Sequence, residues 1–166
     1  PYPIGLAHFI VLDNIIYPDP RDGKGYQGGL RPDQLEFVKN DLQFVPKDHL
    51  VILAFHIPLR NIRTEDRQQL FSYLKDFPHT ISMSAHTHYQ EQIFYAQQDG
   101  WQQEKPHHEY NVGTTSGDWY SGPKDQKGVP ASTMRDGTPK GYAVLHIDGN
   151  QYQFDYKVAD SPKERQ

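Results

Sequence analysis

Two apolar segments that each end in histidine constrain this chain most strongly. They are residues 51–58 (Val-Ile-Leu-Ala-Phe-His-Ile-Pro) and residues 81–88 (Ile-Ser-Met-Ser-Ala-His-Thr-His). Each segment has the length and composition of a buried or β-prone strand. Open α/β sheets bind their ligands just outside the carboxyl ends of the strands. We therefore expect His56, His86 and His88 to lie near one another at a binding site.

The first hundred residues alternate between strand and helix patterns. The order strand, helix, strand, helix, strand, strand predicts an α/β layer with an antiparallel or mixed continuation. Proline begins the first helix pattern and follows the end of both helix patterns. Residues 14–31 form a long loop rich in Gly and Pro. We expect strands at residues 6–13, 50–55, 80–84 and 89–96, and helices at residues 32–44 and 65–77, with Thr64 as the N-cap of the second helix.

The composition changes after residue 100. Residues 101–140 contain few aliphatic side chains and no helical period, which is typical of a loop-rich segment. Residues 142–147 and 152–158 alternate around Asp-Gly-Asn, which predicts a β-hairpin. We therefore divide the chain into an α/β part, residues 1–100, and a small β-rich domain, residues 101–166.

Composition excludes several classes of function. The formal net charge of −4 provides no broad basic surface for nucleic acid, and no apolar run approaches the length of a membrane span. The chain contains no Cys, so any metal must be held by N and O ligands. Because the sequence begins at Pro1 with strand-like residues, we expect the natural N-terminus to lie elsewhere. The sequence reads as a soluble chain, and its location, periplasmic or secreted included, stays open.

The three histidines after the strands point to metal chemistry. In an extended backbone, the His-x-His spacing places both rings on the same side. One histidine at a strand end is more often structural, but two strand ends in one sheet favour a metal site. Imidazoles without thiolates suit zinc, iron, manganese or nickel, and a two-metal centre would need carboxylates from elsewhere.

The remaining patterns are weaker. In a strand, the adjacent His107 and His108 would point to opposite faces, so we expect hydrogen-bonding or surface roles. The same roles are expected for His8, His49, His79 and His146.

Other motifs do not indicate a site by themselves. The glycines of residues 23–28 have the Gly-x-Gly-x-x-Gly spacing of a dinucleotide-binding fingerprint, but no helix follows directly, as that fingerprint requires. There is no Gly-x-Ser-x-Gly elbow for a covalent mechanism. Trp119 and Tyr120, beside Asp118, would either line a ligand cleft or pack in the core.

Together these motifs resemble the calcineurin-like metallophosphoesterases. Phe-His56-x-Pro58 and Ser-Ala85-His86-Thr87-His88 are similar to the last two metal-binding motifs of that family. Residues 9–14 and 29–38 look like the segments between its middle and final motifs, so this resemblance covers residues 4–96. Residues 111–122 and 132–142 are similar to the C-terminal domain found in a bacterial branch of the family.

The resemblance implies the C-terminal half of a four-layer α/β/β/α sandwich, followed by a small loop-rich β domain. It also implies a phosphoester hydrolase, either a serine/threonine-type phosphatase or a phosphodiesterase, with two divalent metal ions (Mn, Fe or Zn). His56 and His86 would bind one metal and His88 the other. One departure is Ala85, where the family usually has glycine, which raises the question of whether this position needs positive φ.

The larger departure is an absence. The family's Asp-x-His, Gly-Asp-x-x-Asp and Gly-Asn-His motifs, which would supply the bridging Asp and the general-acid His, would all precede Pro1. We therefore expect a C-terminal fragment that lacks the N-terminal part of its own domain. Such a fragment would be inactive alone and would bind metal weakly or not at all.

Two alternatives remain open at this stage. Residues 101–166 could form a non-catalytic module that binds a glycan, lipid or protein beside a vestigial metal site. The three histidines could instead hold one zinc ion in a mononuclear protein. The sequence upstream of Pro1 would discriminate between the enzyme and the module, and stoichiometric zinc would favour the mononuclear protein. The identity of the substrate does not follow from the family.

Overall fold

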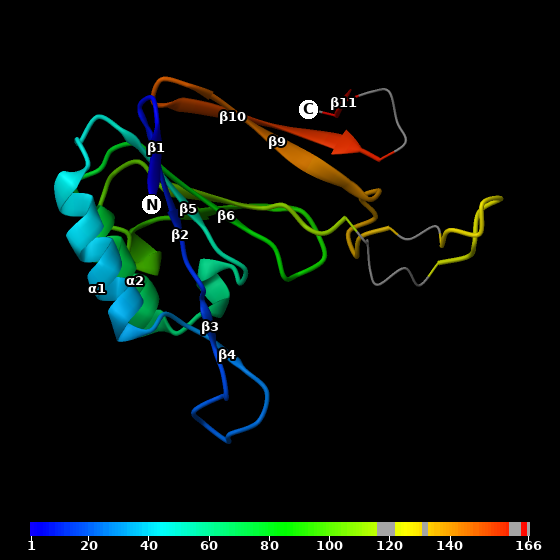
Figure 1. Cartoon of the computed structure of the whole chain (residues 1–166), viewed down its shortest axis with the longest axis horizontal. Coiled ribbons are helices and arrows are strands. Elements are labelled where there is room, and N and C mark those ends of the chain that lie inside the picture. The colour runs from blue at the N-terminus through cyan, green and yellow to red at the C-terminus, as the bar shows by residue number, and fades with distance from the viewer. Residues whose placement is uncertain (116–121, 131–132, 160–163, 166) are drawn as a thin grey trace.

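A computed structural model describes residues 1–115, 122–130, 133–159 and 164–165 (Figure 1). A mixed six-stranded sheet forms its centre, in the order β1-β2-β5-β6-β8-β7. Strands β2, β5, β6 and β8 are parallel, and the edge strands β1 and β7 are antiparallel to their neighbours. The bounds are β1 (Tyr2–Ile4), β2 (Ala7–Val11), β5 (Leu50–Ala54), β6 (Thr80–Ser84), β7 (Glu91–Tyr95) and β8 (His107–Asn111). The predicted mixed α/β sheet is confirmed.

Two helices pack on one face of this sheet (Figure 1). Helix α1 (Pro32–Asp41) begins with proline and carries Asp33 in its first turn, and helix α2 is Thr64–Leu74. Their apolar side chains meet Val51 and Leu53 of β5 in the larger core cluster. Short 3₁₀ helices follow or connect these elements: η1 (Leu42–Phe44), η2 (Leu59–Asn61) and η3 (Gln97–Asp99).

The predicted N-cap of the second helix is wrong by one position. Thr64 is already helical, and Arg63 occupies the N-cap with a non-helical backbone (φ −55°, ψ 134°) and no side-chain cap bond. The Arg63 side chain instead donates through Nε to Asp66 (2.7 Å) and through Nη2 to the Leu30 carbonyl (3.0 Å). Asp66 also accepts from the Leu30 N–H (2.8 Å). These bonds tie the start of α2 to the chain that enters α1.

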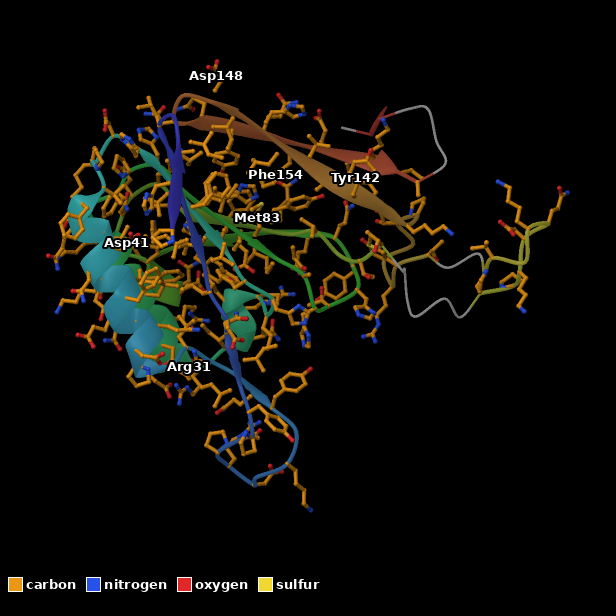
Figure 2. All side chains as sticks on the ribbon, in the orientation of Figure 1. Arg31, Asp41, Met83, Tyr142, Asp148 and Phe154 are labelled. Atoms are coloured by element: carbon orange, nitrogen blue, oxygen red, sulfur yellow. The ribbon has the colours of Figure 1, made fainter. Side chains whose placement is uncertain are left out.

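The predicted hairpin covers the opposite face of the sheet. Strands β9 (Gly141–Asp148) and β10 (Gln151–Val158) pair around a two-residue turn in which Gly149 has φ of 61°. A short β11 (Glu164–Arg165) pairs with β10. Met83 and Phe154 lie between the main sheet and the hairpin (Figure 2). The described residues thus form three layers, namely helices, sheet and hairpin sheet, and the four-layer sandwich stays a prediction.

Three strands occur where the sequence indicated loop. Strand β8 lies between β6 and β7 in the main sheet, and β3 (Ile15–Ile16) pairs with β4 (Gln27–Gly28) inside the long loop. The boundary at residues 100 and 101 stays a prediction, although β8, which follows it, belongs to the main sheet. No helix among the described residues is long and apolar enough to cross a membrane.

Gly141 is required by space at the start of β9. A Cβ at this position would lie 2.2 Å from the Lys157 carbonyl oxygen and 2.8 Å from the Tyr156 ring. We expect Gly141→Ala to lower the free energy of unfolding by about 2 kcal/mol, because the two strands must separate. Tyr142→Ala, at the exposed neighbouring position, should cost less than about 1 kcal/mol. Urea unfolding measures both, and a Gly141→Ala variant as stable as the wild type would contradict this packing.

Candidate metal and phosphoester site

The structure brings two of the three predicted histidines together. His56 follows β5, and His86 follows the adjacent parallel strand β6. Their nearest ring nitrogens, Nε2 of His56 and Nδ1 of His86, are 3.1 Å apart, and the ring centroids are 5.0 Å apart. The two segments are also joined by their backbones, because the Ala85 N–H donates to the His56 carbonyl (3.0 Å). Side chains from two strand ends therefore converge as parallel pairing predicts.

The His-x-His segment is not extended. His86 and His88 have φ of 67° and 59°, and they are the only described non-glycine residues with positive φ. The assumption that places both rings on one side of an extended strand is therefore wrong here. Ala85 is not among these residues, so its departure from the family's glycine removes no needed left-handed conformation. Left-handed backbone at non-glycine residues is unfavourable and collects at functional sites.

The fit of this region to a metal is partial. Burial lowers the pKa of the His86 imidazole, and the neighbouring His56 and His88 lower it further. The neutral form, which binds metal, is thereby favoured. Within the described ranges, however, no three His, Asp or Glu side chains are grouped as ligands for one ion. The described part of the chain thus offers imidazole donors without a complete ligand set.

Asn14 fixes the backbone around His56, although the sequence reasoning did not select it. Its buried side chain accepts hydrogen bonds from the N–H groups of His56 (3.2 Å) and Ile57 (2.9 Å). Its Nδ2 donates to the Ile57 carbonyl (2.6 Å). A polar residue shortly after the end of parallel strand β2, at the same sheet edge as the histidines, is the signal that could have identified it.

Glu109 supports the same region from β8. Its buried carboxylate accepts from the Leu59 N–H (3.1 Å), the Tyr95 hydroxyl (3.0 Å) and the Ser84 hydroxyl (2.5 Å). Burial raises the pKa of this carboxyl group. Glu109 therefore joins the turn after His56 to the end of β6, and its contacts are those of a supporting residue.

The segment carrying His88 is held by the second half of the chain. Asn111 is buried and donates through Nδ2 to the Thr87 hydroxyl. The Arg135 N–H donates to the His88 carbonyl (3.0 Å), and Asp136 accepts from the Gln90 N–H (3.0 Å). Residues beyond position 110 therefore position the loop that carries the candidate ligands.

The other histidines have the hydrogen-bonding roles expected for them where contacts are described. His107 is buried between the hydroxyls of Thr80 (2.8 Å) and Ser82 (2.9 Å), on the helix side of the sheet. His108 faces the hairpin and bonds the Tyr152 hydroxyl (2.8 Å), so the two rings do point to opposite faces. Carboxylate partners hold three more, in the pairs His8–Asp41, His49–Asp48 and His146–Asp155. Asp118, Trp119 and Tyr120, which were expected to line a cleft or pack in the core, lie outside the described residues.

Comparison with known proteins gives one finding for the second half of the chain. A family model described as C terminal of Calcineurin-like phosphoesterase matches residues 109–166. The matched region begins in β8 and includes the hairpin and the loop that contacts His88. No curated protein matches the chain by sequence. The match supports the assignment of residues 109–166 to the C-terminal portion of a calcineurin-like metallophosphoesterase.

Proposed function

We propose that this chain forms part of a metal-dependent phosphoester hydrolase, in which His56 and His86 bind one divalent metal and His88 binds a second. The observation that carries the proposal is the 3.1 Å approach of the His56 and His86 ring nitrogens at the ends of adjacent parallel strands. The match of residues 109–166 to the C-terminal domain of calcineurin-like phosphoesterases supports the same chemistry.

The contributions of this chain are binding and orientation. His56 and His86 would present neutral imidazole nitrogens, and Asn14 and Asn111 would fix the two loops on which the histidines lie. When bound, divalent metals supply a hydroxide nucleophile at neutral pH and stabilise negative charge on the transferring phosphoryl group. No carboxylate in the described residues joins the histidines in a ligand group, so the bridging carboxylate would come from the family's earlier motifs. The chain alone should therefore be inactive.

Hydrolysis of p-nitrophenyl phosphate with added manganese tests this proposal. We expect the product of the parent open reading frame to turn over this substrate and the 166-residue chain to show no turnover. In the active protein, His86→Ala should lower kcat/KM at least about tenfold, because even outer-shell partners of metals typically matter that much.

His146→Ala is the matched control, since this histidine lies on β9 and its side chain is 57% exposed. It should leave kcat/KM unchanged. Appreciable turnover by the 166-residue chain would contradict the need for missing ligands. One tightly bound zinc per chain without hydrolysis would instead favour a mononuclear zinc protein, for which the described residues show no three-ligand cluster. A parent protein without phosphoesterase activity that binds a glycan, lipid or protein would favour the binding module.

A further inference from the structure

A polar cavity of about 420 Å³ opens directly beside His86. Its walls come from the loop before β4, the segment after His56 and the start of α2. Tyr26 brings the first of these segments to the candidate site, because its ring lies edge-on to the His86 ring with centroids 6.1 Å apart. The cavity is thus continuous with the imidazole that would hold a metal, but none of its other lining residues is a candidate ligand.

Two arginines line this cavity, and among its described lining residues there is no carboxylate. Arg21 binds the buried Asp19 through Nε and Nη2, and Arg63 uses the same two nitrogens for Asp66 and the Leu30 carbonyl. Within the described structure, no hydrogen bond engages Nη1 of either guanidinium. Each arginine is therefore held in place by bonds that leave one nitrogen with its donors unused.

The nearby acids reduce the net charge, so recognition here would depend on directed donors. A guanidinium fixed by a carboxylate can still donate charge-assisted hydrogen bonds from its remaining nitrogen, and phosphate oxygens suit that geometry. Asn61 adds a neutral donor at the cavity wall, since its described side-chain bond uses only Oδ1. The guanidinium groups of Arg21 and Arg63 and the amide of Asn61 thus provide hydrogen-bond donors for an oxyanion.

A second cavity, beyond His88, has the opposite character. It measures about 470 Å³ and is lined by Glu91, Asp136 and aromatic rings, with no Lys or Arg among its described lining residues. Like charges would oppose a phosphate there. An anionic part of a substrate therefore suits the cavity beside His86 and not the cavity beyond His88.

We propose that the cavity lined by Arg21, Arg63 and Asn61 binds a second phosphate group of the substrate, so that the preferred substrates are phosphoesters carrying two phosphates. The reaction in this inference rests on the proposed function. Anion binding by the cavity does not require a metal, and so the two are tested separately.

Inorganic pyrophosphate is the probe, titrated into the metal-free 166-residue chain by calorimetry. We expect binding that Arg21→Gln weakens about tenfold, because it removes a charge-assisted donor. Asn61→Asp should weaken binding to a similar extent, because it places a negative charge in the cavity. Both side chains are exposed, so these variants should fold, and circular dichroism checks this.

Arg31→Gln and Asn40→Asp make the same chemical changes at exposed positions that do not line the cavity. They should bind pyrophosphate as the wild type does. The inference is overturned if the wild type does not bind, if the cavity variants bind normally, or if the controls weaken binding equally. Hydrolysis of p-nitrophenyl phosphate, which has no second phosphate, reports on the reaction alone. Hydrolysis by the product of the parent open reading frame without pyrophosphate binding by the 166-residue chain overturns only this inference. Pyrophosphate binding by the chain without hydrolysis by the parent product overturns only the proposed function.

Discussion

Replacing Asn14 with alanine should lower the free energy of unfolding by about 3 kcal/mol, because buried backbone groups would lose their partners. The Asn14 side chain makes three hydrogen bonds to the backbone of His56 and Ile57. The segment carrying His56 would then lose its fixed position. Metal affinity of the active protein should fall about tenfold or more, as for other partners that orient ligands. Urea unfolding and manganese titration measure the two effects.

Asn40→Ala is the matched control for this variant. Asn40 is exposed on α1, and its replacement should change stability by no more than about 0.5 kcal/mol. Asn14→Asp preserves the oxygen that accepts from both N–H groups but loses the donor to the Ile57 carbonyl. Because its buried carboxylate would face the Ile57 carbonyl oxygen, we expect this variant also to be less stable than the wild type. An Asn14→Ala protein with unchanged stability and metal affinity would contradict a positioning role.

Acid should destabilise the fold through His107. Burial, assisted by the nearby His108, lowers the pKa of this imidazole from 6.5 to about 3. Between these values the unfolded chain binds a proton that the folded chain does not, so stability falls as the pH falls below 6.5. At pH 4.5 the loss from this group should be about 3 kcal/mol, since each pH unit below the unfolded pKa contributes about 1.4 kcal/mol.

The difference between the wild type and His107→Gln isolates this effect from other groups that titrate. Glutamine does not titrate, and its amide can still bond the hydroxyls of Thr80 and Ser82. Between pH 7 and pH 4.5, the free energy of unfolding should therefore fall less in His107→Gln than in the wild type. Equal losses in both proteins would show that His107 is not the source of the acid sensitivity.

The positions of the main strands and helices could be predicted because local signals agree with their burial. Strand β6 matches its predicted range, and β5 and both helices differ from theirs by a few residues at their ends. Apolar runs define the strands, and Pro32 and Pro78 limit the helices. Strand β8 escaped prediction because it reads His-His-Glu-Tyr-Asn and is buried only through partners elsewhere, such as Thr80, Ser82 and Tyr152.

In the candidate site, too, some features follow from local sequence and others depend on contacts with distant residues. The approach of His56 and His86 follows from parallel pairing of β5 and β6, which two apolar segments of similar length already indicate. The left-handed backbone of His86 and His88 is not encoded in their residue types. It accompanies long-range contacts, such as the bond from the Arg135 N–H to the His88 carbonyl, which no local pattern reveals. The buried amide of Asn14 likewise depends on residues more than forty positions away.

The positions of the metals in the active protein test directly whether His56, His86 and His88 are metal ligands. Crystals of the product of the parent open reading frame, grown with manganese or zinc, would locate them by anomalous scattering. We expect two metal peaks, one bonded to His56 and His86 and the other to His88, at metal–nitrogen distances of about 2.1 Å. Metal peaks remote from these three imidazoles, or a fully active protein with none of them as ligands, would contradict this expectation.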